Sequence, residues 1–219
     1  MDIATIRITG EDALEFLQGQ LTNDLGRLGS ETEILAAWCN PKGRVIWFGT
    51  IRNDEGGYAL SASADMAEDI VRRLTMFRFR SKVDFELVAE GGNVDPAALL
   101  EQGIPWIGKE QSEQFTPHML NLDLLDAISF DKGCYTGQEI VARTHYKGAT
   151  KRRTARFACD GPAEAGDKVM LAERAVGEVL NVAGHTLLAV VPTELVDQGL
   201  TVGAAKLEHR PLPSFEGRS

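Results

Sequence analysis

The first residues alternate between apolar and polar side chains, a pattern that predicts a β-strand over residues 3–8. Leucines at helical spacing, from Leu14 to Leu21, follow the helix-start residue Asp12 and predict an amphipathic helix. Gly19 falls inside this stretch, and we expect it to end the helix early because glycine disfavours a helix interior.

Two further apolar runs, residues 32–39 and 44–51, flank the sequence Asn40-Pro41-Lys42-Gly43. Proline at the second position and glycine at the fourth are typical of a type I turn. The two apolar runs joined by this turn therefore predict a β-hairpin. A third strand is expected over residues 58–61, after a second turn that ends at Gly57.

Ser63 has the character of a helix cap, and apolar residues from Met66 to Phe77 recur behind it at helical spacing. Residues 82–88 then alternate as a strand. Strands and helices in this order predict an α+β fold, in which helices cover one antiparallel sheet.

The pattern changes towards the C-terminus. Residues 120–128 form a short apolar segment that we expect to be helical. After Thr150, short strands at residues 153–158, 168–172, 177–182, 186–191 and 204–208 alternate with glycine and proline turns. Regularly spaced short strands predict a small β-barrel, so we expect one domain over residues 1–150 and a second over residues 151–219.

Composition and charge limit the classes of protein to which the chain can belong. The chain has 219 residues, a net charge of −9 and three cysteines whose spacing fits no zinc or Cys-x-x-Cys pattern. No apolar run is long enough to span a membrane, and no signal peptide is evident. These features predict a reduced, cytoplasmic protein without membrane contact. The acidic balance argues against general nucleic-acid binding.

One segment carries the opposite charge. Residues 131–153 contain six basic and two acidic side chains, a net charge of +4. Such a patch can attract an anionic ligand, although a solvated basic face fits equally well. Arg143 and Lys147 fall on one face of a predicted helix there, where they can meet folate glutamates or RNA phosphates.

A cysteine lies between two glycines within this segment, in the sequence Lys132-Gly133-Cys134-Tyr135-Thr136-Gly137-Gln138-Glu139. Thr136 and Glu139 have the spacing of a capping box, so we expect Cys134 to lie just ahead of a helix N-terminus. The helix dipole and Lys132 would both favour a thiolate there, with a pKa lowered to roughly 3.5–7.5. A buried structural cysteine is the alternative.

This octapeptide matches the hallmark of the YgfZ family of folate-binding, iron–sulfur-associated proteins, which the chain resembles. Other matching stretches are Phe16-Leu17-Gln18-Gly19-Gln20-Leu21-Thr22-Asn23-Asp24, Asn40-Pro41-Lys42-Gly43-Arg44-Val45, Arg80-Ser81-Lys82-Val83, Phe115-Thr116-Pro117 and Asn121-Leu122-Asp123. The resemblance implies a fold similar to the aminomethyltransferase (T-protein) of the glycine cleavage system. It also implies tetrahydrofolate as ligand and iron–sulfur enzymes as partners, among them those that methylthiolate tRNA.

Activity in the family depends on the motif cysteine, which implies a reactive site at Cys134. Lys132, Gln138 and Glu139 would then surround the thiol, and Gly133, Tyr135 and Gly137 would supply the backbone that presents it. The polar residues Gln20, Asn23, Lys42 and Arg44 can line a pterin pocket, with Arg143 at its edge. Ordinary turn chemistry is the alternative for the first four.

Two departures from the family pattern bear on the reaction. Trp47 and Phe48 stand where the T-protein has a catalytic aspartate, and neither can act as a carboxylate base. Only about thirty residues, 89–117, bridge the strand that ends near Val88 and the approach to the hallmark, where longer members have an extra segment that partly lines the folate pocket. This departure implies either that folate binding is lost or that the ligand is held more openly. The resemblance thus favours a folate-binding accessory protein over an enzyme. A one-carbon transferase and a weak tRNA-binding module are the alternatives.

The remaining candidate ligands give no clear site. Cys39 and Cys159 lie in apolar, strand-like surroundings typical of core residues. One exposed cysteine cannot hold an iron–sulfur cluster alone, because four thiolates are usual. The four histidines, at positions 118, 145, 185 and 209, are scattered along the chain. We therefore expect no stably bound metal.

Overall fold

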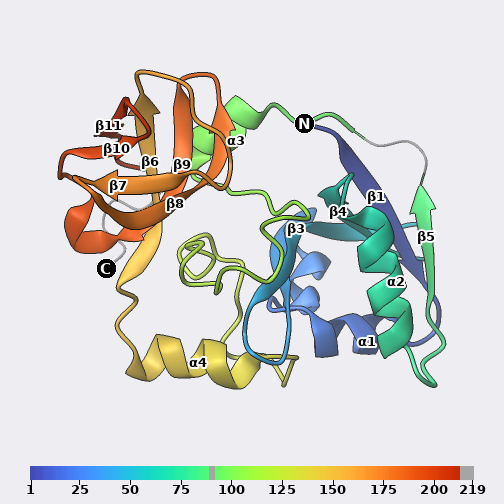
Figure 1. The fold of residues 1–219 in the computed structure, drawn as a ribbon. Coiled ribbons are helices and arrows are strands. Elements are labelled where there is room, and N and C mark those ends of the chain that lie inside the picture. The colour runs from blue at the N-terminus through green and yellow to red at the C-terminus, as the bar shows by residue number, and fades with distance from the viewer. Residues whose placement is uncertain (89–91, 213–219) are drawn as a thin grey trace. The chain divides into compact units, whose positions relative to one another are not determined.

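The structure is a computed structural model that describes residues 1–88 and 92–212. The first part of the chain forms β1 Ile3–Thr9, α1 Ala13–Gln20, a 3-10 turn Leu25–Gly29, β2 Glu33–Cys39, β3 Val45–Asp54, β4 Gly57–Ser63, α2 Ala67–Phe77 and β5 Asp84–Val88 (Figure 1). The later part forms α3 Pro96–Gln102, α4 Gln138–Lys147, β6 Arg152–Cys159, β7 Lys168–Leu171, β8 Arg174–Ala183, β9 Thr186–Pro192, a 3-10 turn Thr193–Leu195, β10 Leu200–Val202 and β11 Ala205–His209.

The chain divides into two compact units. The first comprises Met1–Val94, Trp106–Pro117 and Leu125–Arg143, and the second comprises Asp95–Pro105, His118–Leu124 and Thr144–Ser219. Two separate segments, Asp95–Pro105 and His118–Leu124, thus group with the barrel, as do the residues from Thr144 onward. No helix in the described ranges combines the length and the apolar character that crossing a membrane requires.

The first unit is built on a five-stranded antiparallel sheet in the order β2-β3-β4-β1-β5. Alternate residues such as Ile6 and Ile8 face the core, where they meet Phe16 and Leu17 of α1 and Ile70 of α2. Both helices therefore pack on the same face of the sheet. The predicted hairpin is confirmed, since β2 pairs with β3 through Trp38 and Trp47.

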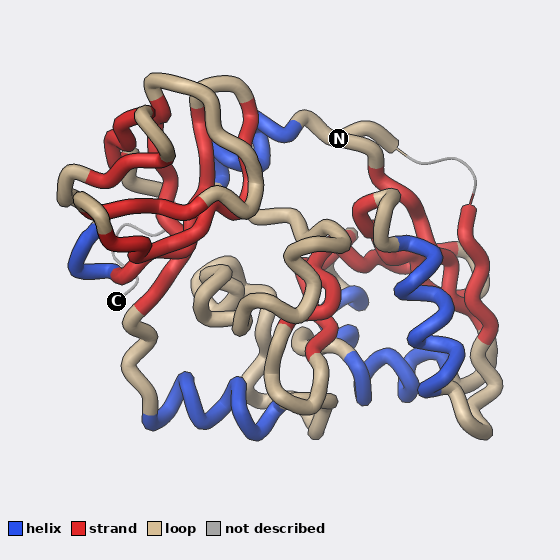
Figure 2. Tube along the Cα trace, in the orientation of Figure 1, coloured by secondary structure: helices blue, strands red, loops and turns tan. Residues whose placement is uncertain are grey.

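The second unit contains a closed antiparallel barrel in the order β10-β11-β6-β9-β8-β7. Its strands are red in Figure 2, and the turns between them are tan. Closure leaves no unpaired strand edge, which suits strands as short as β10. The core holds inward-facing residues such as Phe157 and Val191. An α+β sheet-and-helix fold followed by a small barrel was predicted from the sequence, and that prediction is confirmed.

Several local predictions were wrong. Helix α1 continues through Gly19 to Gln20, and Leu14 is exposed while Phe16 is buried. Ser63 ends β4, and α2 begins four residues later without a side-chain cap. The segment expected to be helical at residues 120–128 forms turns instead, because Asn121 and Asp126 take a left-handed backbone with φ of 58°. Strand β10 was missed.

Candidate functional site

Residues 131–137, called the cysteine loop from here on, present the Cys134 thiol to solvent. Cys134 is exposed, whereas Cys39 and Cys159 are buried, as expected of core residues. Burial raises the pKa of Cys39 to about 12, so that thiol stays protonated and unreactive. Exposure is the first requirement for reactivity, and among the cysteines Cys134 alone meets it.

Lys132 holds one end of the loop. Its ammonium group donates to the backbone carbonyls of Gln18, Leu21 and Asn23 at 2.8, 2.7 and 2.9 Å. These carbonyls belong to the C-terminal end of α1 and the residues after it, where the helix leaves acceptors unsatisfied and the dipole is negative. Burial lowers the pKa of Lys132 to about 8, and Asp24 opposes this shift. The observed contacts of Lys132 therefore brace α1, whereas the sequence predicted a partner for the cysteine.

Tyr135 and Thr136 hold the other end. The Tyr135 side chain is buried, and the Lys132 ammonium lies 5.4 Å from the centre of its ring. The Thr136 backbone donates to the Gly19 carbonyl at 3.2 Å, and its hydroxyl donates to Gln20 Oε1 at 3.3 Å. That same oxygen accepts from Trp38 Nε1 at 3.2 Å. Gln20, predicted as a ligand residue, thus connects the cysteine loop to the sheet.

Gly137 is the point of closest approach between the loop and the β2–β3 turn. It takes a φ of +82°, and a Cβ there would lie 2.5 Å from the Asn40 carbonyl oxygen. Asn40 in turn organises its own turn, since its Oδ1 accepts from the backbone of Lys42 and Arg44 at 2.9 and 3.0 Å. A side chain at Gly137 would therefore collide with the β2–β3 turn, whereas Gly133 has open space around it.

The capping-box prediction was wrong. Helix α4 begins at Gln138, directly after the left-handed Gly137, so Thr136 lies one residue too early to cap it. Gln138 Oε1 instead accepts from the Tyr135 backbone at 3.3 Å, which tightens the turn between the loop and the helix. Glu139 and Arg143 are exposed along the helix, as is Lys147.

The predicted pterin-pocket residues do not gather in one place. Asn23 is fully buried, and its side chain donates to the Leu35 and Asp126 carbonyls at 2.7 and 2.8 Å. It therefore serves the fold. Arg44 donates to the Gln114 carbonyl at 2.7 Å, and Lys42 is exposed on the turn. Trp47 and Phe48 are both buried, and Trp47 Nε1 donates to the Ser61 carbonyl.

Gln20 lines a cavity of about 800 Å³ at the junction of α1, the end of α2 and the turn that follows it. Phe77 and Phe79 supply apolar ring surface, and Phe79 is 87% exposed. The other lining residues are Asp12, Glu15, Phe16, Gly19, Arg80 and Ser81. A neighbouring hollow of about 320 Å³ shares Phe77 and includes Thr136 of the cysteine loop.

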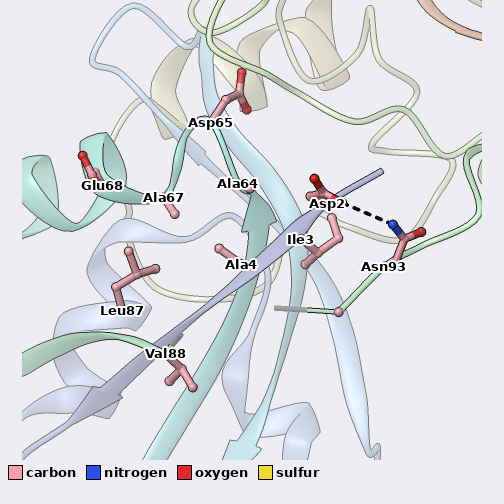
Figure 3. A pocket seen from close by; sticks show the side chains of 11 residues that line it. Asp2, Ile3, Ala4, Ala64, Asp65, Ala67, Glu68, Leu87, Val88 and Asn93 are labelled. Carbon is pink, nitrogen blue, oxygen red and sulfur yellow. Dashed lines mark hydrogen bonds between the residues drawn. The ribbon is translucent and has the colours of Figure 1, made fainter. Parts of the chain in front are cut away.

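A third cavity, of about 590 Å³, lies between β1, the start of α2 with the turn before it, and β5 (Figure 3). Its polar side chains are Asp2, Asp65, Glu68 and Asn93, and small apolar residues make up the rest. Asn93 donates to Asp2 at 3.2 Å across it. Three carboxylates with no basic residue among these lining groups make it unsuitable for an anionic ligand.

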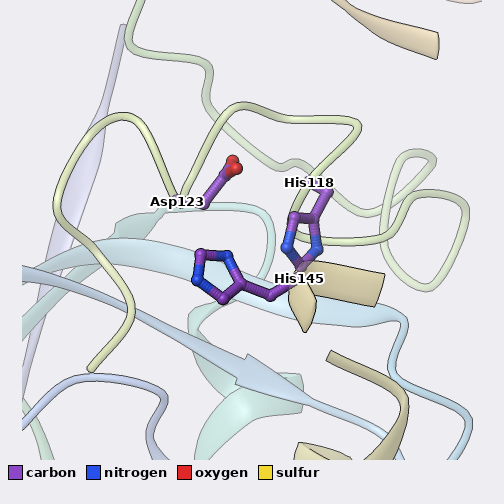
Figure 4. Close-up of side chains that lie close together, drawn as sticks. All are labelled: His118, Asp123 and His145. Carbon is purple, nitrogen blue, oxygen red and sulfur yellow. The ribbon is translucent and has the colours of Figure 1, made fainter. Parts of the chain in front are cut away.

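Two histidines that are distant in sequence come together in the second unit. His118, Asp123 and His145 place one ligand atom each within 4.8 Å of the others (Figure 4). Burial lowers the pKa of His118, an effect that Asp123 opposes and that Arg153 and His145 reinforce. The scatter of histidines along the sequence gave no sign of this cluster.

Comparison with known proteins is consistent with this architecture. Residues 151–214 match the family model described as the C-terminal beta-barrel domain of CAF17. An uncharacterized protein of Haemophilus influenzae is 31% identical over 189 residues, which cover 67% of this chain and 68% of the relative. The tRNA-modifying protein YgfZ of Escherichia coli is 27% identical over 221 residues, with 69% and 68% covered.

A second YgfZ, from Hamiltonella defensa, is 27% identical over 222 residues, and the match spans 69% of this chain and 66% of that protein. The glycine cleavage system aminomethyltransferase T of Bartonella henselae superimposes with a TM-score of 0.77 at 15% identity, covering 97% of this chain and 85% of that structure. The structural likeness establishes the fold. The sequence relatives and the matched barrel show that the chain belongs to the YgfZ family.

Proposed function

We propose that this chain is a tetrahydrofolate-binding accessory protein that sustains iron–sulfur enzymes, including tRNA-modifying ones, through the thiol of Cys134. The observation that carries the proposal is the exposure of Cys134 on a loop held at both ends. Relatives named tRNA-modifying protein YgfZ support the tRNA connection. A thiolate is a soft ligand for iron and a nucleophile, and either property would serve such a role.

We expect Cys134→Ala to keep the melting temperature within about 2 °C of wild type, because an exposed side chain contributes little to stability. The same variant should fail to complement a strain that lacks its own YgfZ. Asp131→Ala, an exposed neighbour in the same loop, is the matched control and should complement fully. Full complementation by Cys134→Ala would show that the function does not require the thiol.

For folate, the cavity that Gln20 lines is the strongest candidate. Its size lies within the usual range for small-molecule sites, about 300–1,000 Å³. Phe77 and Phe79 can stack on flat rings, and Glu15 can accept from the amino group and ring N–H of a pterin. Arg80 can pair with the carboxylates of the glutamate tail. The hydrogen bond from Thr136 to Gln20 links this cavity to the cysteine loop.

Isothermal titration with tetrahydrofolate under reducing, anaerobic conditions tests this assignment. We expect saturable binding that Arg80→Ala weakens about tenfold, the loss typical of one charge-assisted contact. Arg52→Ala removes an exposed arginine on β3 and should leave the affinity unchanged. Wild-type binding that Arg80→Ala does not affect would place folate elsewhere. The absence of any binding would remove folate from the proposal while leaving Cys134 in it.

A further inference from the structure

We propose that His118, Asp123 and His145 form a binding site for a first-row divalent transition-metal ion, for which Zn²⁺ is the reference occupant. Two imidazole nitrogens and one carboxylate oxygen make up the donor set, and all lie within 4.8 Å of one another (Figure 4). This site lies in the second unit and uses none of the residues assigned to the thiol or to folate.

The geometry needs only a small contraction to enclose an ion. Ligand atoms in a tetrahedral zinc site are about 3.3 Å apart, given zinc–nitrogen distances of about 2.0–2.1 Å. His118 is only 2% exposed and the Asp123 side chain 9%, so these two donors are held by their surroundings. His145 is exposed, and its ring centre lies 6.1 Å from that of His118.

Arg153 fixes the carboxylate in place. It donates to both oxygens of Asp123 at 2.9 and 2.8 Å, and to Asn121 Oδ1 and the His118 carbonyl at 3.2 Å each. Contacts of this kind orient metal ligands in known sites, and their loss typically costs 10–100-fold in affinity. Each carboxylate oxygen has a second lone pair, so pairing with Arg153 leaves acceptor capacity for a metal. The positive charge of Arg153 offsets part of the attraction, which favours moderate affinity.

The donor set also selects the kind of ion. Imidazole suits zinc, copper, iron and nickel, whereas Mg²⁺ and Ca²⁺ prefer oxygen ligands throughout. With three protein ligands and an exposed side at His145, the remaining coordination positions would be taken by water. A site of this type is able to exchange its metal, unlike a closed structural site.

The test is titration of the metal-stripped full chain with zinc sulfate, in a Cys134→Ser background because an exposed thiol can itself take up zinc. We expect one saturable site, and we expect His145→Ala to weaken binding at least tenfold. His145 is exposed, so this variant should fold normally. His185→Ala removes an exposed histidine from the turn between β8 and β9 and is the matched control, with unchanged affinity expected.

Cobalt provides a second readout that reports on the ligands. Co²⁺ added to the Cys134→Ser chain should give a visible spectrum without a thiolate charge-transfer band, and Asp123→Asn should diminish it. Paramagnetic broadening of the imidazole signals of His118 and His145, but not of His185, would place the ion at the cluster. No saturable binding of either metal, or affinity that His145→Ala leaves unchanged, would overturn the proposal.

Discussion

Replacing Lys132 by methionine should lower the free energy of unfolding by about 3 kcal/mol or more. Methionine keeps much of the apolar stem but leaves three backbone carbonyls, those of Gln18, Leu21 and Asn23, without their charged donor. Each hydrogen bond to a charged group contributes about 1.5–3 kcal/mol, and the lower end applies because Lys132 is partly exposed. Helix α1 has no basic residue in its own last turn, so Lys132 is also the cation that its dipole meets.

Urea denaturation followed by circular dichroism measures this loss. Lys42→Met is the matched control, because it removes the same charge from an exposed turn position and should change stability by less than about 0.5 kcal/mol. If the two variants were equally stable, the three carbonyls would be satisfied without Lys132. Its contacts would then contribute nothing to the fold.

Lys132 also illustrates what the sequence could predict and what it could not. Its neighbourhood in the chain suggested a lysine acting on Cys134 two residues away. The partners it actually contacts lie more than a hundred positions earlier in the chain. Local sequence patterns carry information about helices and turns. A long side chain that caps a helix distant in the sequence produces no such pattern. The motif left an exposed and a buried Cys134 both open, and the structure exposes it.

The helices and strands were largely predictable where the apolar residues followed a single periodicity. Strands β1, β2 and β3 alternate or run apolar between clear turns, and their positions were found within a few residues. The segment at residues 120–128 failed because its apolar residues fit a helix while Asn121 and Asp126 take a left-handed backbone. Asparagine and aspartate tolerate that conformation, and tertiary contacts determine where they use it. Asn121, for example, donates to the Thr154 carbonyl at 2.7 Å.

Gly137→Ala should destabilise the first unit by about 3 kcal/mol and displace the cysteine loop. The residue takes a φ of +82°, and a side chain there typically costs about 1–3 kcal/mol. A Cβ would also lie 2.5 Å from the Asn40 carbonyl oxygen and 3.2 Å from Cys39 Cβ. Both neighbours are held, Asn40 by its turn and Cys39 by burial at the end of β2, so the loop must move.

Gly133→Ala provides the matched control within the same motif. Nothing lies within 4 Å of the Cβ that this substitution would add, so stability should stay within about 0.5 kcal/mol of wild type. Maleimide labelling of native protein completes the comparison, since Cys134 should react alone in wild type and Gly133→Ala, whereas Gly137→Ala should also expose Cys39. Protection of Cys39 in a fully stable Gly137→Ala variant would mean that the loop and the β2–β3 turn are not in close contact. The glycine would then serve neither the packing nor the presentation of the thiol.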